Sequence, residues 1–148
     1  MRYVSIDCEM TGLNVEDHDI LEFGAVIDNL ADPQPIEDLP RYHCYFVKDT
    51  YSGSAGALAM HPIIFNRIDK REAGYTYISP MKFGNHFKTF LLEHGFSEKS
   101  GRVVINAAGK NFGRKDAAFL EKHTDLHKHV RIRTCLMDPA ILFYKEGD

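Results

Sequence analysis

The sequence predicts an α/β protein in which helices pack on a mixed β-sheet. Three strand-like segments, residues 2–8, 20–28 and 42–47, are joined by connections too short for a helical crossover, so we expect an antiparallel meander. Helical and strand-like segments then alternate, and the short apolar run at residues 103–106 is typical of a central parallel strand. This order of elements favours one mixed sheet flanked by helices.

The three N-terminal strands are predicted from their side-chain patterns. Residues 2–8 alternate around Val4 and Ile6, which is typical of a strand with one buried face. Residues 20–28 are mostly apolar, and residues 42–47 alternate aromatic and smaller side chains. The run Thr11–Asn14 breaks the first strand.

The first helices are predicted from apolar spacing and from capping residues. Apolar side chains follow helical spacing over residues 57–68, where Pro62 would begin a second helix. Ser79 is a predicted N-cap, Pro80 takes the first helical position and Gly95 ends that helix. The side chains expected on its buried face are Met81, Phe83, Phe87, Phe90 and Leu91.

The C-terminal third completes the alternation. Residues 69–78 and 97–102 are charged or polar, so we expect surface connections there. Residues 112–123 are predicted to be helical and residues 130–135 to form a last strand, with a final short helix over residues 138–143.

The composition excludes several classes of protein. The 148 residues suit one domain, and their net charge of −3 argues against a protein that coats nucleic acid by charge alone. No apolar run approaches the roughly 20 residues of a membrane helix, and no signal peptide precedes the first strand. The sequence has three widely spaced cysteines, Cys8, Cys44 and Cys135. An odd number without a CxxC pair favours reduced thiols in the cytoplasm over disulfides or a zinc cluster.

Two carboxylates near the end of the first strand are candidate metal ligands. Because side chains at positions i and i+2 of a strand share a face, Asp7 and Glu9 would project side by side. Two close carboxylates repel each other, and hard oxygen ligands suit Mg²⁺ or Mn²⁺. Two such ions roughly 3.5–4 Å apart can clamp the attacking and leaving oxygens of a phosphodiester, with Asp7 as the bridging ligand. A solvated strand end is the alternative interpretation of a bare Asp-x-Glu.

The sequence around these carboxylates resembles the first motif of the DEDD superfamily of 3′–5′ exonucleases, which includes ribonuclease T, oligoribonuclease and proofreading subunits. Tyr3–Leu13 combine an apolar strand, Asp-x-Glu and Thr-Gly-Leu, and Asp19–Val26 are similar to the family's second strand. The resemblance implies a ribonuclease-H-like fold with an antiparallel and a parallel part. It also implies two-metal hydrolysis, with Mg²⁺ or Mn²⁺, at the 3′ end of single-stranded RNA or DNA, releasing nucleoside monophosphates.

A second acidic motif fits the same resemblance. The family places an Asp in the pattern Asp-x-x-Phe-Leu at the start of a helix, and residues 116–120 match this pattern. They follow the apolar segment 103–106 and a glycine-containing turn, as the family requires. The resemblance therefore implies that Asp116 joins Asp7 and Glu9 as a catalytic, metal-holding carboxylate.

The resemblance also implies four substrate-binding residues. Met10 and Thr11 would lie beside the terminal nucleotide, and Leu13 would wedge against its base. His61 falls in a segment that helps to form the family's substrate groove. Backbone N–H groups and a small apolar side chain can grip a base without reading its identity, which suits an enzyme that accepts many sequences.

The family's third motif is not found. It consists of a His followed five positions later by an Asp, and none of the eight His residues fits. Tyr144 and Asp148 match the alternative Tyr-x-x-x-Asp spacing, but they follow Asp116 too closely and include Gly147 between them. We therefore expect a C-terminally incomplete exonuclease domain over residues 1–148, lacking its last helix, with weak or absent activity unless the natural protein continues.

Two other functions are considered. A non-catalytic exonuclease-like module that binds nucleic acid or a protein would share the same fold and carboxylates. A phosphate-binding loop at residues 109–111 is rejected, because the upstream glycine and the Ser or Thr after the Lys are both missing. Without its last helix the domain would expose apolar sheet surface, so we expect a homodimer.

Overall fold

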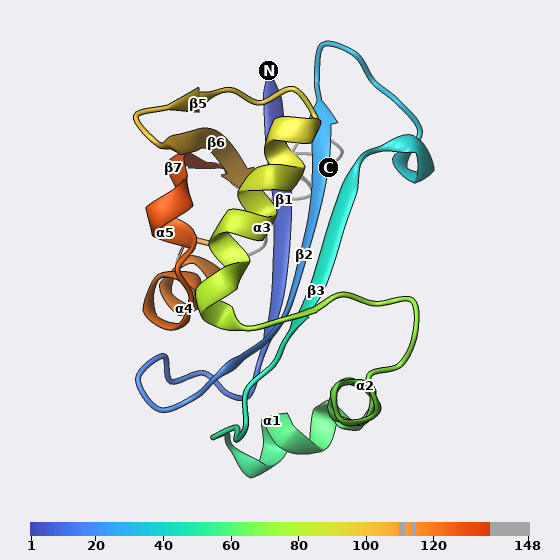
Figure 1. Cartoon of the computed structure of the whole chain (residues 1–148), viewed down its shortest axis with the longest axis vertical. Helices are drawn as coiled ribbons and strands as arrows, with labels where there is room; N and C mark the ends of the chain where they lie inside the picture. The colour runs from blue at the N-terminus through green and yellow to red at the C-terminus, as the bar shows by residue number, and fades with distance from the viewer. Residues whose placement is uncertain (110–111, 114, 137–148) are drawn as a thin grey trace, which may run out of the picture.

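The computed structural model describes residues 1–109, 112–113 and 115–136, with main chain only for the last three of these. Within them, seven strands form one mixed sheet in the order β4-β3-β2-β1-β6, with β5 and β7 both pairing with β6. Figure 1 shows the long strands side by side with helices on one side. The predicted α/β class and the mixed sheet are confirmed.

The N-terminal meander is antiparallel, as predicted. Strand β1 (Arg2–Met10) pairs with β2 (Ile20–Asn29), and β2 pairs with β3 (Arg41–Phe46). A short 3₁₀ turn, η1 (Ile36–Asp38), lies between β2 and β3. Strand β1 extends two residues past the predicted end, so that Glu9 is part of the strand.

The parallel part of the sheet is also confirmed. Strand β6 (Arg102–Ala108) runs parallel to β1 on one side and to β7 (Val130–Leu136) on the other. Two strands of two residues each were missed, β4 (Tyr77–Ile78) and β5 (Glu98–Lys99). They lie in the segments predicted to be surface connections, because a two-residue strand has no periodicity to detect.

Five helices occur in the described residues: α1 (Ala55–Met60), α2 (Pro62–Lys70), α3 (Pro80–Glu93), α4 (Asp116–His123) and α5 (Leu126–His129). The predicted break before Pro62 is confirmed, whereas α4 begins later than predicted and α5 was not predicted. The helix expected over residues 138–143 lies outside the described residues. None of these helices has the length and apolar character needed to cross a membrane.

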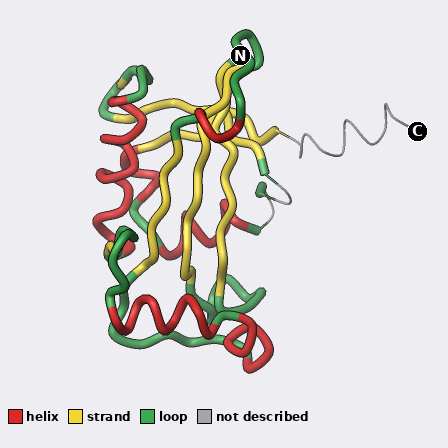
Figure 2. The backbone as a smooth tube through the Cα atoms, turned by 90° about the vertical axis from the view of Figure 1, so that its right-hand side faces the viewer, coloured by secondary structure: helices red, strands yellow, loops and turns green. Residues whose placement is uncertain are grey.

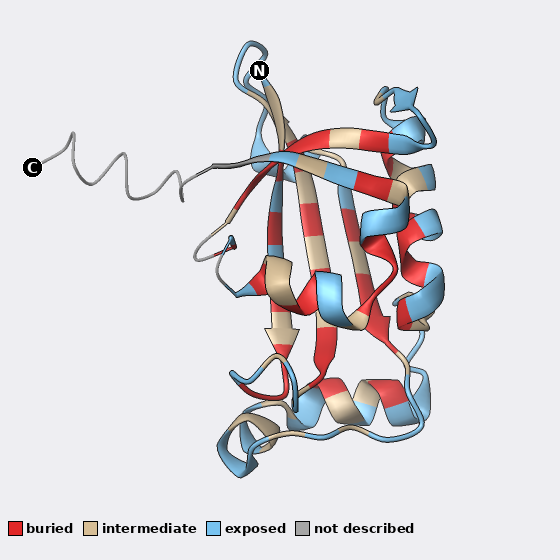
Figure 3. Ribbon diagram, turned by 90° about the vertical axis from the view of Figure 1, so that its left-hand side faces the viewer, coloured by how far each residue is buried: buried red, intermediate tan, exposed pale blue. Residues whose placement is uncertain are grey.

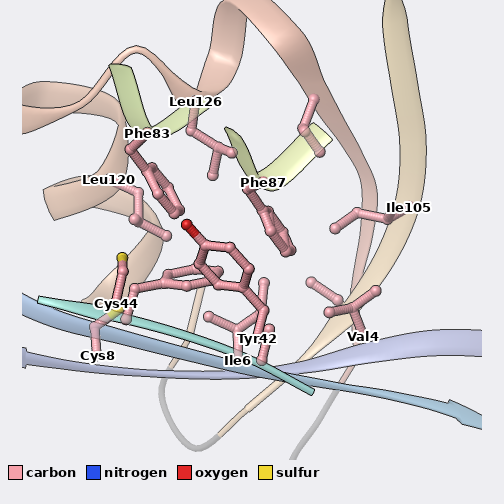
Figure 4. Close-up of a cluster of buried hydrophobic side chains, with 14 of the residues drawn as sticks. Val4, Ile6, Cys8, Tyr42, Cys44, Phe83, Phe87, Ile105, Leu120 and Leu126 are labelled. Carbon is pink, nitrogen blue, oxygen red and sulfur yellow. The ribbon is translucent and has the colours of Figure 1, made fainter. Parts of the chain in front are cut away.

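Helices α3, α4 and α5 cover one face of the sheet (Figures 1 and 3). The core between them joins Val4 and Ile6 of β1 to Phe83, Phe87 and Leu120 (Figure 4). The opposite face, towards the viewer in Figure 2, has helices α1 and α2 only at its end. The sheet therefore has one buried face and one face that is largely open among the described residues.

The prediction that Met81 lies on the buried face of α3 is wrong. Phe83, Phe87 and Leu91 are buried at intervals of four residues, but the Met81 residue is 61% exposed. Met81 lies two positions before Phe83, which places it on the other side of a helix with 3.6 residues per turn. A methionine in the first turn was therefore assigned to the wrong face.

A β-bulge interrupts the pairing of β1 and β2 next to the carboxylates. Glu9 faces Glu22, whereas Met10 faces Ile20, so Leu21 is an extra residue on β2. Ile20 belongs to the main core, but Leu21 packs in a second cluster with residues of α2 and β3: Tyr45, Ile64 and Ile68. The bulge thus lets β2 contribute apolar side chains to two separate cores.

Helices α3 and α5 approach each other closely at Gly84. The Gly84 N–H donates to Asp125 Oδ1 at 2.7 Å. A Cβ at this position would lie 2.8 Å from the Asp125 carbonyl oxygen and 2.7 Å from the His129 ring. Only a residue without a side chain fits between the two helices without displacing backbone.

We predict that Gly84→Ala destabilises the protein by about 1–3 kcal/mol, because the added methyl overpacks the α3–α5 contact. Denaturant unfolding measures this. The control is Gly56→Ala in α1, where a Cβ meets nothing within 4 Å. That change removes a glycine from the first turn of α1 and should stabilise the protein by up to about 1 kcal/mol. Equal stability of the two variants would contradict the close packing.

Candidate active site

Asp7 and Glu9 lie on the open face of β1, near its C-terminal end. Burial alternates along the strand, with Ile6, Cys8 and Met10 directed into the core. Asp7 is exposed and Glu9 is half-buried between them. The predicted geometry, two neighbouring carboxylates on one face, is therefore present.

The edge of β1 beside these carboxylates is not covered by β6. Strand β6 pairs with β1 only at Val4 and Ser5, and it ends at Ala108. The next residue, Gly109, lies so close to β1 that a Cβ would be 2.5 Å from the Ile6 carbonyl oxygen. A glycine is needed for the chain to leave β1 there, and no described strand pairs with this edge of β1 beyond Ser5.

Asp116 occupies this free edge. The Cys8 N–H donates to Asp116 Oδ2 at 3.2 Å, a contact between residues 108 positions apart in the sequence. Asp116 is the first residue of α4 and is 4% exposed. The third predicted carboxylate is thus bonded to the backbone of the residue that separates the first two.

The three carboxyl groups affect one another electrostatically. Burial and the nearby Asp7 charge raise the pKa of Asp116 to about 6, although the hydrogen bond from Cys8 and the Lys115 charge act in the opposite direction. Burial also raises the pKa of Glu9, which the neighbouring His61 partly offsets and Asp7 reinforces. A cation placed among these groups would lower the cost of keeping them ionised.

Two histidines lie beside the acidic residues. His61 Nε2 is 3.6 Å from Glu9 Oε2, and the His61 side chain is only 12% exposed. His61 precedes Pro62, the first residue of α2, so the break between the two short helices places the ring against Glu9. On the next strand, Glu22 faces Glu9 and is held by His43 at 2.6 Å.

A comparison with protein families shows which family the chain belongs to. Residues 4–79 match the model of a family described as exonuclease, of the ribonuclease T type. The chain belongs to this exonuclease family. No curated protein matches the sequence.

Membership makes the chain a nuclease of the DEDD type, with the mixed α/β fold expected of that superfamily. The matched exonuclease region includes Asp7, Glu9 and His61 but ends before Asp116. The assignment of Asp116 therefore depends on its place at the edge of β1 and on its helix-start motif.

DEDD exonuclease domains generally use divalent metal ions, and the donor set of this exonuclease fits such ions. Asp7, Glu9 and Asp116 offer hard carboxylate oxygens, and the raised pKa values of two of them reflect burial and uncompensated negative charge. Within the described residues, no three His, Cys, Asp or Glu side chains already converge as a ligand cluster. The carboxylates are therefore neighbours whose side chains would have to turn towards a common ion.

The predicted substrate residues of the exonuclease fall into two groups. Leu13 is 80% exposed in the loop after β1, where its side chain is available to a ligand. Met10 is buried in the core, and Thr11 is fully buried. The Thr11 N–H donates to the Asp19 carbonyl oxygen at 2.8 Å, and its hydroxyl donates to the Ser52 carbonyl oxygen. It stays a prediction that a nucleotide contacts Met10, Thr11, Leu13 and His61.

A buried polar network beside the site was not predicted. Asp19 is buried, pairs with Lys48 and accepts the Ser52 N–H at 2.7 Å. Its own N–H donates to Thr11 Oγ1 at 2.7 Å. The network ties the loop before α1 to the end of β1, so it fixes the segment that leads to His61. No spacing rule relates Asp19 to a lysine 29 positions later, so the sequence gives no signal for it.

We predict that Asp116→Asn raises the melting temperature of the metal-free exonuclease at pH 7.5 but not at pH 4. The folded-state pKa of about 6 lies above the ordinary value of 3.8, so the folded protein binds the proton more tightly. Its stability therefore falls as pH rises between these values, because ionising the buried carboxyl is costly. Asparagine keeps the acceptor for the Cys8 N–H without the charge.

Thermal melts from pH 4 to 8 in a chelator measure this difference. The matched control is Asp49→Asn, which removes a carboxyl from an exposed position. An advantage of Asp116→Asn that is the same at every pH, or that Asp49→Asn shares, would contradict the assignment.

Proposed function

We propose that this protein is a 3′–5′ exonuclease that removes nucleoside monophosphates from single-stranded RNA or DNA with two divalent metal ions. The observation that carries the proposal is the hydrogen bond from the Cys8 N–H to Asp116. It brings a carboxylate from α4 to the strand that bears Asp7 and Glu9. Family membership supports the nuclease class, and this contact supports an acidic centre formed by the three carboxylates.

In the proposal, Asp7, Glu9 and Asp116 hold Mg²⁺ or Mn²⁺, with Asp7 as the bridging ligand. Bound ions would activate a water molecule and neutralise charge on the scissile phosphate. Asp7 is exposed and can reach ions above the sheet, whereas Asp116 is anchored by Cys8. The anchored Asp116 would thus set the position of the ions, and the exposed Asp7 would close around them.

The chain's other residues would hold the 3′ end. Leu13 projects into solvent from the loop that follows β1, and its apolar side chain would pack against the terminal base. His61, next to Glu9, would orient that carboxylate and line the groove. Met10 and Thr11 would contribute to substrate binding by holding the end of β1 in place. None of these contacts reads a base edge, which fits cleavage independent of sequence.

A second candidate is a non-catalytic module that binds nucleic acid or a protein. One observation favours it: no His in the sequence is followed by Asp at the fifth position, so the family's usual general base is not among residues 1–148. Loss of a general base lowers rates by about 10²–10⁴. We therefore propose that these 148 residues alone hydrolyse weakly while still binding metal and strand.

The proposal also includes one exonuclease domain over residues 1–148 and a cytoplasmic location. The buried free thiols of Cys8 and Cys44 support a reducing compartment. The homodimer stays a prediction without a surface assigned to it. Exposed large hydrophobic side chains in the described residues belong to separate elements, for example Leu13, Ile36 and Ile63.

We predict that the protein shortens a 5′-labelled single strand stepwise in Mn²⁺. Asp7→Asn should lower the cleavage rate by on the order of 10²-fold or more, because the substitution removes a charge that stabilises the transition state. Gel electrophoresis of RNA and DNA substrates measures this. Asp49→Asn is the control for an exposed carboxyl and should match the unaltered chain. Equal laddering by Asp7→Asn would contradict the active site, whereas binding without laddering by any variant would favour the module.

We further predict that Mn²⁺ raises the melting temperature of the unaltered chain and not that of Asp7→Asn. A ligand at 100 times its Kd stabilises the folded state by about 2.7 kcal/mol, which a thermal melt resolves. This measurement does not require catalysis, so it tests the metal site in either candidate function. A shift of equal size in both proteins would place the metal elsewhere.

A further inference from the structure

Four basic side chains gather at one edge of the sheet. Lys99 of β5, Arg102 of β6, and Arg131 and Arg133 of β7 are all exposed. They line one open hollow together with Ser97, Ser100 and Val104. We call these four basic residues the basic edge.

The basic edge lies on the same face of the sheet as Asp7 and Glu9. On β6 and β7, the residues Val103, Ile105 and Val130 are buried in the core under the helices. Arg102 and Arg131 occupy the alternate positions, so their Cα–Cβ bonds point to the open face, where both line a hollow with Val104. At the rim of the sheet both also border α4 and α5, where Arg102 donates to the His127 carbonyl oxygen. Lys99 pairs with Arg102 in register and shares its face.

The basic edge has no carboxylate partner in the part of the chain that the structure describes. Among the described residues, no carboxylate lies within ion-pair distance of these four side chains, whereas Lys48, Lys88 and Lys122 are each paired. Arg102 and Arg133 make only long hydrogen bonds of 3.4 Å, to the His127 carbonyl oxygen and to Asn106 Oδ1. Like charges that gather without a carboxylate partner among the described residues, in a protein of net charge −3, indicate a polyanionic ligand.

The distance between the basic edge and the acidic centre suits a strand of several nucleotides. Ser5 faces Ala108, and Arg102 begins β6 six residue steps before Ala108. At about 3.3 Å per step Arg102 is roughly 20 Å from that pair, and Asp7 lies two steps further along β1. Twelve stacked nucleotides at about 3.4 Å each exceed that distance, whereas a dinucleotide cannot reach across it.

We propose that the basic edge binds the phosphates of a single-stranded nucleic acid whose 3′ end lies at Asp7, Glu9 and Asp116. This inference depends on the proposed function, since the acidic centre fixes where the 3′ end lies. The strand crosses the open face from β1 over β6 to β7, with its 5′ portion towards Arg102 and Lys99. Guanidinium and ammonium groups contact phosphates without regard to base, so this contact lengthens the binding site without adding sequence preference.

The test compares two double variants in an Asp7→Asn background, so that the strand is not cut. Arg131→Gln/Arg133→Gln removes two charges from the basic edge. Lys70→Gln/Lys82→Gln removes two charges from exposed positions on α2 and α3. Fluorescence anisotropy measures the Kd for a 12-nucleotide and a dinucleotide oligo(U) and oligo(dT) over a range of salt concentrations, and thermal melts confirm that both variants are folded.

We expect Arg131→Gln/Arg133→Gln to weaken binding of the 12-nucleotide strand about tenfold at low salt. The slope of log K against log salt should fall by about 1.4, the loss of two phosphate contacts on a single strand. The dinucleotide Kd should stay within twofold, and the lysine variant should match the parent for both lengths.

Equal affinity of both double variants for the 12-nucleotide strand would overturn the inference, as would a matching loss for the dinucleotide. Failure of the proposed function has a different signature, because it appears as no stepwise cleavage by the unaltered chain and no Mn²⁺ stabilisation. Stepwise cleavage by the unaltered chain, together with unchanged strand binding by Arg131→Gln/Arg133→Gln in the Asp7→Asn background, would therefore reject the basic edge alone.

Discussion

The site depends on the edge of β1 that β6 leaves unpaired. Because β6 pairs only with Val4 and Ser5 and then departs at Gly109, the Cys8 N–H has no strand partner on that side. A buried backbone N–H needs an acceptor, and Asp116 provides it. The need of this backbone N–H for an acceptor thus brings the carboxylate at the start of α4 next to the two carboxylates of β1. A β1 strand paired along its whole length would leave no place for Asp116.

This arrangement concentrates negative charge where the protein cannot easily disperse it. Asp116 is buried, and Glu9 has Glu22 directly opposite on β2. The structure offsets part of this charge locally, since His43 holds Glu22 and His61 lies against Glu9. The raised pKa values of Asp116 and Glu9 show that the compensation is incomplete. The remaining imbalance is the physical reason to expect divalent cations rather than a set of internal ion pairs.

Sequence reasoning predicted the parts of the fold and site that follow local patterns. The alternation around Asp7 and Glu9 fixed their common face, and Pro62 and Pro80 marked helix starts correctly. It was wrong at Met81, which helical periodicity places opposite Phe83, and it missed β4 and β5, which are too short to show a period. The pairing of Asp19 with Lys48 across 29 positions depends on tertiary contacts that no local pattern encodes. The family motif located Asp116, but its hydrogen bond to Cys8 depends on where β6 ends, which no local pattern encodes.

The open face carries one acidic and one basic region, which the net charge of the whole chain does not reveal. A net charge of −3 argued against binding of nucleic acid by charge alone, and it averages an acidic centre on β1 with a basic edge on β5, β6 and β7. A single strand needs both, since metal ions at the carboxylates would neutralise the scissile phosphate while fixed cations neutralise the phosphates behind it. The pleat of one sheet directs both sets of side chains to the same side, because every second residue of parallel strands shares a face. The same alternation that buries Val4, Ile105 and Val130 under the helices therefore directs the proposed phosphate-binding side chains to the other side.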